Sequence, residues 1–428
     1  MGDLLPDSAG LRRVIHTVRD VRLGAETTFA GGVLTVSASE MAGLLAAPAL
    51  ATAGVSLAAP GSSTRIVKVL DCVEPRCKGG GPGIFPGLLG PAKVQGRGET
   101  HVLSGAAVVA AGYLPRAQEA LIDMSGPAAG LSPLGTTHNV VVTFTPAEGA
   151  AWEEVDLAVR RGTLRVAARL AEAARAAEPD AVEEVGAAPS SSGAGGLPDI
   201  GAITNLQTQG SFKDVFFYGR SLGGSPPVLI DAREIEDGAV VSGQYGHPAL
   251  RNPTFIHQNN PIVAALRAAD GDRCRFAGLI LCPEPVEQGA KELAAAHTAR
   301  LCAALGWQAA IISKEGGGNA DSDISLKMDA LEAAGVVAIG LFAEMSGADG
   351  TGAPVVSPPV TATGMISTGN YDQRLALPAV EEAIGAERFD LLGVDATAAM
   401  EVPTAVVIAA LSPMGWGKLT AAGAGAIA

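Results

Sequence analysis

The chain has 428 residues, of which 48% are hydrophobic and 17% charged, so it has ample apolar material for a core and too little charge for a disordered chain. At roughly 100–200 residues per domain, this length predicts two or three domains. The 30 Lys and Arg residues against 44 Asp and Glu residues give a formal charge of −14, which disfavours nucleic acid as a partner because an acidic surface repels phosphates.

Cysteine usage and the N-terminal residues predict a cytoplasmic protein. The cysteines are too few and too scattered for a disulfide scaffold, and their odd number fits a reducing compartment. Cys72 and Cys77 match no common zinc spacing, which favours shielded thiols, although a redox pair or metal site stays open. Asp3 and Asp7 stand where a signal peptide needs positive charge. The apolar run 41–60 predicts a short helix, a loop and a strand rather than a membrane span, so we expect no membrane partner. We also expect no metal.

Residues 1–177 predict a β-rich N-terminal domain that ends in a helical segment. Short segments rich in Val, Ile, Leu and Thr predict strands at 11–18, 26–37, 64–74, 101–111 and 139–146. The Ala-, Leu- and Arg-rich stretch 151–177 predicts a helix. The density of Gly and Pro over 79–91 predicts a fixed irregular loop, which is either a structural turn or a contact for a ligand or partner.

Residues 178–201 are rich in Pro, Ser, Gly and acids and predict a linker, after which residues 202–428 predict an α/β domain. Apolar runs at 202–207, 276–282, 308–313 and 336–342 alternate with helical patterns at 286–305 and 322–334. A last apolar run at 403–411 fits either a helix or a strand. The sequence therefore predicts an α/β protein, with a β-rich N-terminal domain and a C-terminal domain whose mainly parallel sheet is flanked by helices.

A loop with three consecutive glycines follows the predicted strand 308–313 and carries Glu315, Asn319 and Asp321. Ligands of parallel sheets bind beyond the carboxyl ends of the strands, so these side chains are candidates to face a ligand. An equally good interpretation is a plain loop in which Asp321 or Ser322 caps the next helix. The loop is not a nucleotide-binding glycine motif, and its acids would repel a pyrophosphate.

A second polar cluster runs from Ser242 to Pro261 and is dense in amide and imidazole groups. Asn260 followed by proline fits the N-cap and first turn of a helix. Asn259 has a local interpretation too, as a partner for nearby backbone. His257 and Gln258 have no such local role, which favours a functional site in this cluster.

Many short stretches, in a fixed order, match a known family. They are Val73-Glu74-Pro75-Arg76, the loop from Gly81 through Gly87, His101-Val102-Leu103, Asp123 through Pro127, Leu206 through Gly210, Asp237 through Gly243, His257 through Pro261, Glu315 through Asn319, Thr368-Gly369-Asn370 and Gly415 through Leu419. In these residues and their spacing, nearly the whole chain resembles the component B subunit of the glycine, sarcosine and betaine reductases, which is made as a proprotein.

The resemblance implies a self-cleaving chain, with one departure. In the family, the chain cuts itself before a cysteine and the new terminus becomes a pyruvoyl group, while a partner's selenocysteine or cysteine attacks the substrate carbon and expels the amine. Alignment places Tyr245 where that cysteine should be, with Gln244 before it. Tyr has no thiol for the acyl shift that starts such cleavage. We therefore expect a chain that stays whole, with no pyruvoyl group and no other cofactor.

The resemblance also suggests roles for the two polar clusters. The catalytic candidates are Tyr245, which would donate a hydrogen bond or stack on a cation, His257, which would move a proton, and Glu315, which would pair with an ammonium. The candidate substrate-binding residues carry amide or carboxylate groups and are Gln244, Gln258, Asn259, Asn260, Asn319 and Asp321. The expected partners are a reductase-like subunit with a redox cysteine or selenocysteine, and a small amine or amino acid as substrate.

Three functions stay open at this point. The first is a subunit of a reductase-like complex that cleaves C–N bonds by thiolate or selenolate displacement at carbon. The second is a repurposed family member in C–S or C–N bond chemistry of a biosynthetic or catabolic pathway. The third is a non-catalytic scaffold that stabilises a catalytic partner.

Overall fold

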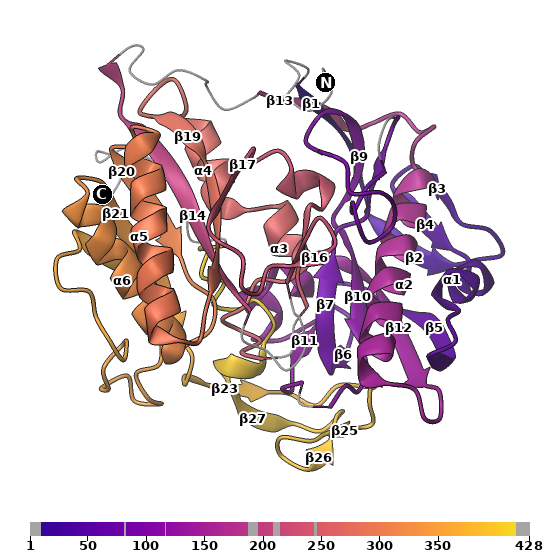
Figure 1. Cartoon of the computed structure of the whole chain (residues 1–428). Helices are drawn as coiled ribbons and strands as arrows, with labels where there is room; N and C mark the ends of the chain where they lie inside the picture. Colours follow the sequence, from indigo (N-terminus) through magenta and orange to yellow (C-terminus); the bar gives the residue numbers. More distant parts are fainter. Residues whose placement is uncertain are drawn as a thin grey trace.

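Two groups of β-sheets, one from each half of the chain, lie side by side in the computed structural model (Figure 1). The structure describes residues 10–80, 83–115, 117–186, 196–208, 215–243 and 246–416. The protein is α/β, as the sequence predicts. In the described ranges, no helix is long and apolar enough to cross a membrane.

Small sheets of mixed parallel and antiparallel strands form the N-terminal half. One has the order β13-β1-β9-β8, from Ala181–Val185, Leu11–Thr17, Gly98–Ser104 and Arg76–Lys78. A second has the order β5-β12-β10-β7, from Leu50–Ala58, His138–Pro146, Ala106–Ala111 and Val69–Val73. A third has the order β2-β4-β3, from Asp20–Leu23, Val33–Val36 and Thr28–Ala30. The strands predicted in this half are confirmed, with the longer predicted segments split in two.

Two helices pack on these sheets. Helix α2, Trp152–Glu172, buries an apolar face that includes Val155, Val159 and Leu170. The short helix α1, Ala38–Leu45, precedes β5, which confirms the predicted helix, loop and strand over 41–60. The two helices touch closely, because a Cβ atom at Gly162 in α2 would lie 2.8 Å from a methyl carbon of Leu45.

A six-stranded sheet forms the centre of the C-terminal half. Its order is β17-β19-β14-β20-β21-β22, from Val228–Ile230, Arg275–Glu284, Asp199–Gln207, Ala309–Ser313, Val337–Glu344 and Gly364–Asn370. All neighbours are parallel except β17, which runs antiparallel to β19. The predicted parallel sheet is therefore confirmed.

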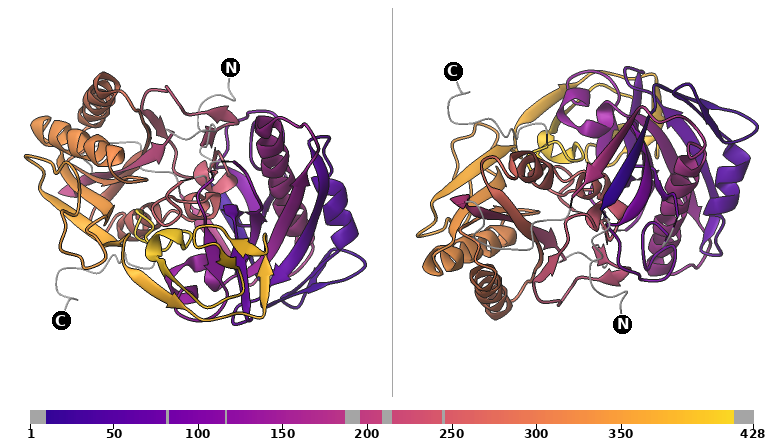
Figure 2. Two further views of the ribbon diagram at one scale, coloured as in Figure 1. Left: turned by 90° about the horizontal axis from the view of Figure 1, so that it is seen from below. Right: turned by 90° about the horizontal axis from the view of Figure 1, so that it is seen from above.

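Helices cover both faces of this sheet (Figure 2). On the outer face lie α5, Gln288–Ala304, and α6, Asn319–Ala333. On the other face lie α3, Thr254–Gln258, and α4, Pro261–Ala269, whose apolar side chains share a core with residues of the N-terminal sheets. A small sheet of β15, Phe216–Phe217, β16, Arg220–Ser221, and β18, Val240–Val241, leads into this region.

The last described residues return to the N-terminal half. Strand β24, Glu382–Ile384, pairs in parallel with β6, Thr64–Val67, which also pairs with β11, Leu121–Asp123. Two antiparallel pairs lie at the bottom of Figure 1: β23 with β27, Arg374–Leu377 and Met400–Pro403, and β25 with β26, Arg388–Phe389 and Val394–Asp395. Sheet pairing thus crosses the proposed domain boundary, and the division at 178–201 stays a proposal.

Three local predictions need correction. The predicted linker 178–201 contains β13 and the start of β14. The run 403–411 is neither a helix nor a strand beyond its first residue, but a short 3-10 turn, Thr404–Val406, followed by further turns. Helix α6 starts at Asn319 with Gly318 before it and without a side-chain cap, so neither Asp321 nor Ser322 is the N-cap.

The glycine-rich loop 79–91 is described at residues 79–80 and 83–91, and the second stretch is a structural turn. Phe85 is fully buried with a φ of 52°, and a Cβ atom on Gly238 would lie 2.2 Å from its ring. Gly87 lies so close to Tyr218 that a Cβ atom would be 2.1 Å from the Tyr218 carbonyl oxygen. The loop therefore packs against its own chain.

Arg65, on β6, joins the two halves. Its side chain is fully buried and donates to the Asp123 carboxylate at 2.6 and 3.2 Å. It also donates to three backbone carbonyls of the returning segment, at 2.9 Å each, those of Pro378, Ala396 and Ala398. One guanidinium thus satisfies a buried carboxylate and fixes the C-terminal segment on the sheet.

Asp71, on β7, connects the N-terminal sheets to the second polar cluster, residues 242–261, through Thr254. Its carboxylate accepts hydrogen bonds from the Thr254 backbone at 2.9 Å and the Thr254 hydroxyl at 2.7 Å. The same hydroxyl accepts from the Ser242 backbone at 2.9 Å. Burial raises the pKa of Asp71 to about 6.

Replacing Arg65 with Met should lower the free energy of unfolding by about 3–5 kcal/mol, because Asp123 is left as an uncompensated buried charge. Urea unfolding followed by circular dichroism measures this loss. The matched control is Arg374→Met, since Arg374 is 45% exposed beside Glu401 and its pair contributes about 1 kcal/mol or less. Equal losses in the two variants would contradict the assigned role of Arg65.

Asp71 should make stability fall as pH rises. Its pKa is raised from 3.8 to about 6 on folding, so the folded state binds the proton more tightly, and that stabilisation is lost between about pH 4 and pH 6. Relative to Asp71→Asn, the wild type should lose up to about 3 kcal/mol over this range. Urea unfolding of both proteins at several pH values checks it, and a difference that does not change with pH would refute it.

Candidate functional site

The carboxyl ends of the parallel strands carry a buried carboxylate, Glu315, directly after β20. It accepts hydrogen bonds from the Gln207 backbone at 2.9 Å and from the Asn252 backbone and side-chain nitrogens at 3.0 and 3.1 Å. His257, on α3, places its Nε2 atom 3.5 Å from Oε1 of Glu315. The fold therefore brings together two of the three catalytic candidates.

The charge state of Glu315 follows from these neighbours. Burial by itself raises the pKa of Glu315, but the hydrogen bond and charge of His257 and the charge of Arg251 bring it below its ordinary value. The Arg251 guanidinium lies 4.0 Å from the carboxylate. Glu315 is therefore held as an anion in the protein interior, where it stabilises a positive charge on its partners.

Asn319 and Asp321 make other contacts. Asp321 pairs with the buried Lys314 and accepts a hydrogen bond from the Val356 backbone at 2.8 Å. The Asn319 carbonyl oxygen accepts from Lys291 on α5 at 3.2 Å. These contacts tie the first turn of α6 to its neighbours.

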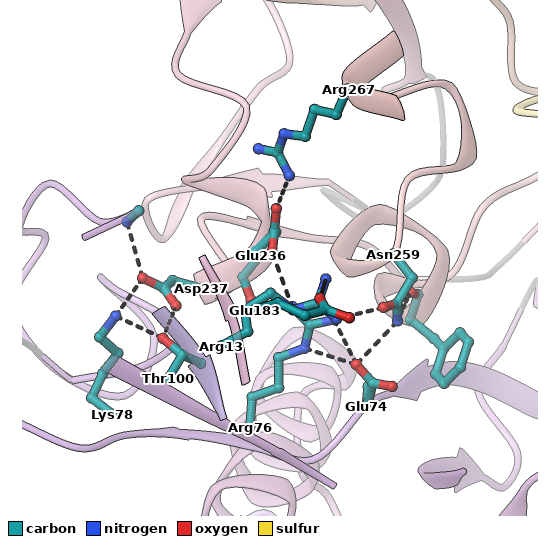
Figure 3. Close-up of polar contacts among 12 residues, drawn as sticks. Arg13, Glu74, Arg76, Lys78, Thr100, Glu183, Glu236, Asp237, Asn259 and Arg267 are labelled. Carbon is teal, nitrogen blue, oxygen red and sulfur yellow. Dashed lines mark hydrogen bonds and ion pairs between the residues drawn. The ribbon is translucent and has the colours of Figure 1, made fainter. Parts of the chain in front are cut away.

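The three amides that follow His257 hold the corner between α3 and α4. Gln258 clamps the backbone of Glu74, accepting from its nitrogen at 2.9 Å and donating to its oxygen at 3.2 Å. Asn259 accepts from Arg76 at 2.7 Å and donates to the Glu74 carboxylate at 3.2 Å (Figure 3). Asn260 accepts from two backbone nitrogens of α4 at 3.0 and 3.2 Å, which confirms the predicted N-cap.

These contacts belong to a polar interface that the sequence did not reveal (Figure 3). Arg76 donates to Glu74 at 2.8 Å, and both are buried. Beside them, Lys78 donates to Asp237 at 2.6 Å. The family resemblance includes the stretches that contain Glu74, Arg76 and Asp237. That was the one sequence signal that could have pointed to this interface.

Gln244 and Tyr245 lie outside the described residues, but the chain on either side is fixed. On one side, Arg160 donates to the Ser242 carbonyl at 2.7 Å, and a Cβ atom on Gly243 would lie 2.4 Å from the same guanidinium. On the other side, the His247 backbone donates to the Gln118 side chain at 2.7 Å. His247 has a left-handed backbone, with φ of 54°.

A cleft of about 570 Å³ lies beside His247, with the next residue, Pro248, in its wall. Gln118 and Pro248 form part of its wall, and Tyr371, another wall residue, has its ring 6.0 Å from that of His247. Burial, together with the charges of Arg251 and Lys314, lowers the pKa of His247. The segment 247–252 thus runs from the cleft to the buried carboxylate of Glu315.

The cysteines are placed as structural thiols. All five are buried and free, and burial raises the pKa of both Cys72 and Cys77. Within the described ranges, no group of three or more His, Cys, Asp or Glu side chains is arranged to hold a metal ion.

Comparison with known proteins matches residues 11–422 to the family described as glycine/sarcosine/betaine reductase component B subunits. A relative from Peptoclostridium acidaminophilum, named glycine reductase complex component B subunits alpha and beta, is 34% identical over 95% of this chain and 98% of its own length. The sarcosine and betaine reductase complex component B subunits alpha of that organism are 31% and 28% identical, over 94% and 86% of this chain and 97% and 86% of their own lengths.

No solved structure matches the chain. The family match nevertheless spans both sheet groups and every polar contact of the site described above. Together with the relative that is 34% identical along nearly its whole length, it decides the assignment. The chain belongs to the family of glycine/sarcosine/betaine reductase component B subunits.

Proposed function

We propose that this protein is a subunit of a reductase complex that removes nitrogen from an amine or amino acid together with a partner subunit. The observation that carries the proposal is the family match over residues 11–422. The named relatives are component B subunits of glycine, sarcosine and betaine reductase complexes, whose substrates share a carbon bound to an amine nitrogen.

The proposed reaction is a displacement at carbon. A thiolate or selenolate of the partner attacks the carbon that carries nitrogen, so that a C–S or C–Se bond forms as the C–N bond breaks. The nitrogen leaves with the bonding electron pair. When the nitrogen carries a positive charge before the bond breaks, the leaving group is a neutral amine. Two thiols of a reductant then supply two electrons and two protons. The C–S or C–Se bond breaks, the carbon fragment leaves with a new C–H bond, the partner's thiol or selenol is restored, and the reductant becomes a disulfide.

His257 and Glu315 are proposed to manage charge near this reaction. An imidazole can give or take a proton, and that of His257 lies 3.5 Å from the buried Glu315 carboxylate. Since both oxygens of Glu315 already accept hydrogen bonds, we assign it a positioning role, acting through His257. Gln258, Asn259 and Asn260 are assigned to holding the α3–α4 corner rather than to the substrate, because they bond to the protein itself.

A scaffold without catalytic residues of its own is the second candidate function. It is favoured by one observation, that His257 and Glu315 are almost completely buried, with side chains only 2% and 0% exposed. In this case the partner subunit would supply all the chemistry. Mutation of the two residues separates the candidates.

The purified protein should be a single chain of 42.9 kDa, without a pyruvoyl group. Tyr245 offers no thiol for the acyl shift that precedes such cleavage. Intact-mass spectrometry under denaturing conditions measures this. The glycine reductase relative named as subunits alpha and beta serves as the control, and two fragments split near Tyr245 would refute the proposal.

In the reconstituted complex, His257→Gln should lower kcat about 100-fold or more, the usual size of a lost proton-transfer group. Glu315→Gln should lower kcat less and should shift the pH profile of kcat, because it acts through the histidine. His297→Gln, on α5, is the matched control and should retain full activity. Full turnover by the His257 and Glu315 variants, with unchanged thermal unfolding, would establish the scaffold instead.

A further inference from the structure

The cleft beside His247 has the size and the position that are usual for a ligand-binding site. It lies where the N-terminal sheets meet the returning C-terminal segment, and its wall includes Lys68 and Glu119 from the first half and Tyr371 and Asp390 from the second. Its volume of about 570 Å³ falls within the range of about 300–1,000 Å³ that is usual for pockets of drug-sized ligands. Glycine or betaine would fill a small part of it.

The charged groups of the cleft have an excess of negative charge. Lys68 pairs with Asp390 and lies 3.5 Å from the Oε2 atom of Glu119, so one ammonium faces two carboxylates. Oε2 of Glu119 also accepts from the Asp390 backbone at 3.0 Å. Its other oxygen, Oε1, is buried and has no hydrogen-bond partner among the described residues.

An unpartnered buried carboxylate oxygen is costly, and a bound cation would satisfy it. The Glu119 side chain is only 7% exposed. Burial raises the pKa of Glu119, which is the response expected of a carboxyl group that lacks a sufficient cationic partner. An ammonium group beside Glu119 would therefore supply the hydrogen-bond donor that Oε1 lacks among the described residues.

Aromatic and apolar side chains form the rest of the cleft. The Tyr113 ring already has a cation near it, since Nζ of Lys68 lies 5.8 Å from its centroid. Aromatic rings attract organic ammonium ions. The apolar lining, which includes Leu70, Leu114, Leu391 and Val406, offers no polar group to a ligand's body.

We propose that this cleft binds an organic ammonium ion that carries an apolar group, with the ammonium on Glu119 and the apolar group against the leucines. As a statement about the substrate, this proposal rests on the proposed function. It places that substrate in a class of larger, more apolar amines than glycine. The segment 247–252 connects the cleft to the Glu315 carboxylate.

Isothermal titration calorimetry of the whole purified chain tests the proposal with three probes. 2-Phenylethylammonium should bind, whereas the neutral isostere 2-phenylethanol and glycine should each bind at least about tenfold more weakly, because a charged hydrogen bond to Glu119 is worth roughly that factor or more. No binding of the ammonium probe, or equal binding of the alcohol, would overturn the proposal.

Glu119→Gln should weaken 2-phenylethylammonium at least about tenfold while leaving 2-phenylethanol unchanged, since Gln keeps the side chain's shape and can still accept from Asp390. Glu401→Gln is the matched control, because Glu401 is 64% exposed and pairs with Arg374, and it should change neither affinity. Ala117→Phe, at the cleft wall, should weaken both probes. Unchanged affinity for the ammonium in Glu119→Gln would refute the assignment.

Binding to the isolated chain needs no partner and no turnover, so the two proposals fail separately. Ammonium binding without any activity in the reconstituted complex would remove the proposed function and leave the site. Turnover in the reconstituted complex, with no binding of 2-phenylethylammonium to the isolated chain, would remove the site and leave the proposed function.

Discussion

Buried charged side chains whose hydrogen bonds and ion pairs reach distant parts of the chain hold this structure together. Arg65, Arg76 and Lys78 each carry a full charge into the interior, and each finds a carboxylate there. A buried charge without its partner costs several kcal/mol, so each of these groups must keep its contacts. Glu74 is only two residues from Arg76, and Arg76 reaches the other half of the chain through the Glu236 carbonyl and the Asn259 side chain. Lys78 and Asp237 come from opposite sides of the predicted linker, and the carbonyls bound by Arg65 lie beyond residue 377. Neither half is therefore complete in its polar contacts without the other.

The candidate site inherits its geometry from this arrangement. Glu74 and Arg76 hold the α3–α4 corner by hydrogen bonds to Gln258 and Asn259. On the other side of this corner, His257 contacts Glu315. The cleft lies at the same junction, with walls from both halves. The candidate site and the fold therefore depend on the same contacts.

Sequence reasoning was most reliable where the signal is local. The strands, α2 and the alternation that predicts a parallel sheet follow from apolar patterns within short windows, and the Asn260 cap follows from the proline after it. It failed where a distant group decides. Asp321 is a good cap by composition, but the buried ammonium of Lys314 takes its carboxylate. The contact between His257 and Glu315 joins residues on different elements, and nothing in either neighbourhood encodes the distance between them.

The pairing of β24 with β6 has a consequence for synthesis of the chain. Strand β6 is made early, yet one of its two edges is covered only by residues 382–384. On the ribosome, that edge stays open while more than 300 further residues are added, since β6 ends at Val67. An open strand edge is a template for aggregation, and the buried Arg65 on the same strand lacks its C-terminal carbonyls during this interval. Emergence of residues 382–384, rather than emergence of the N-terminal sheets, is the event that closes this edge.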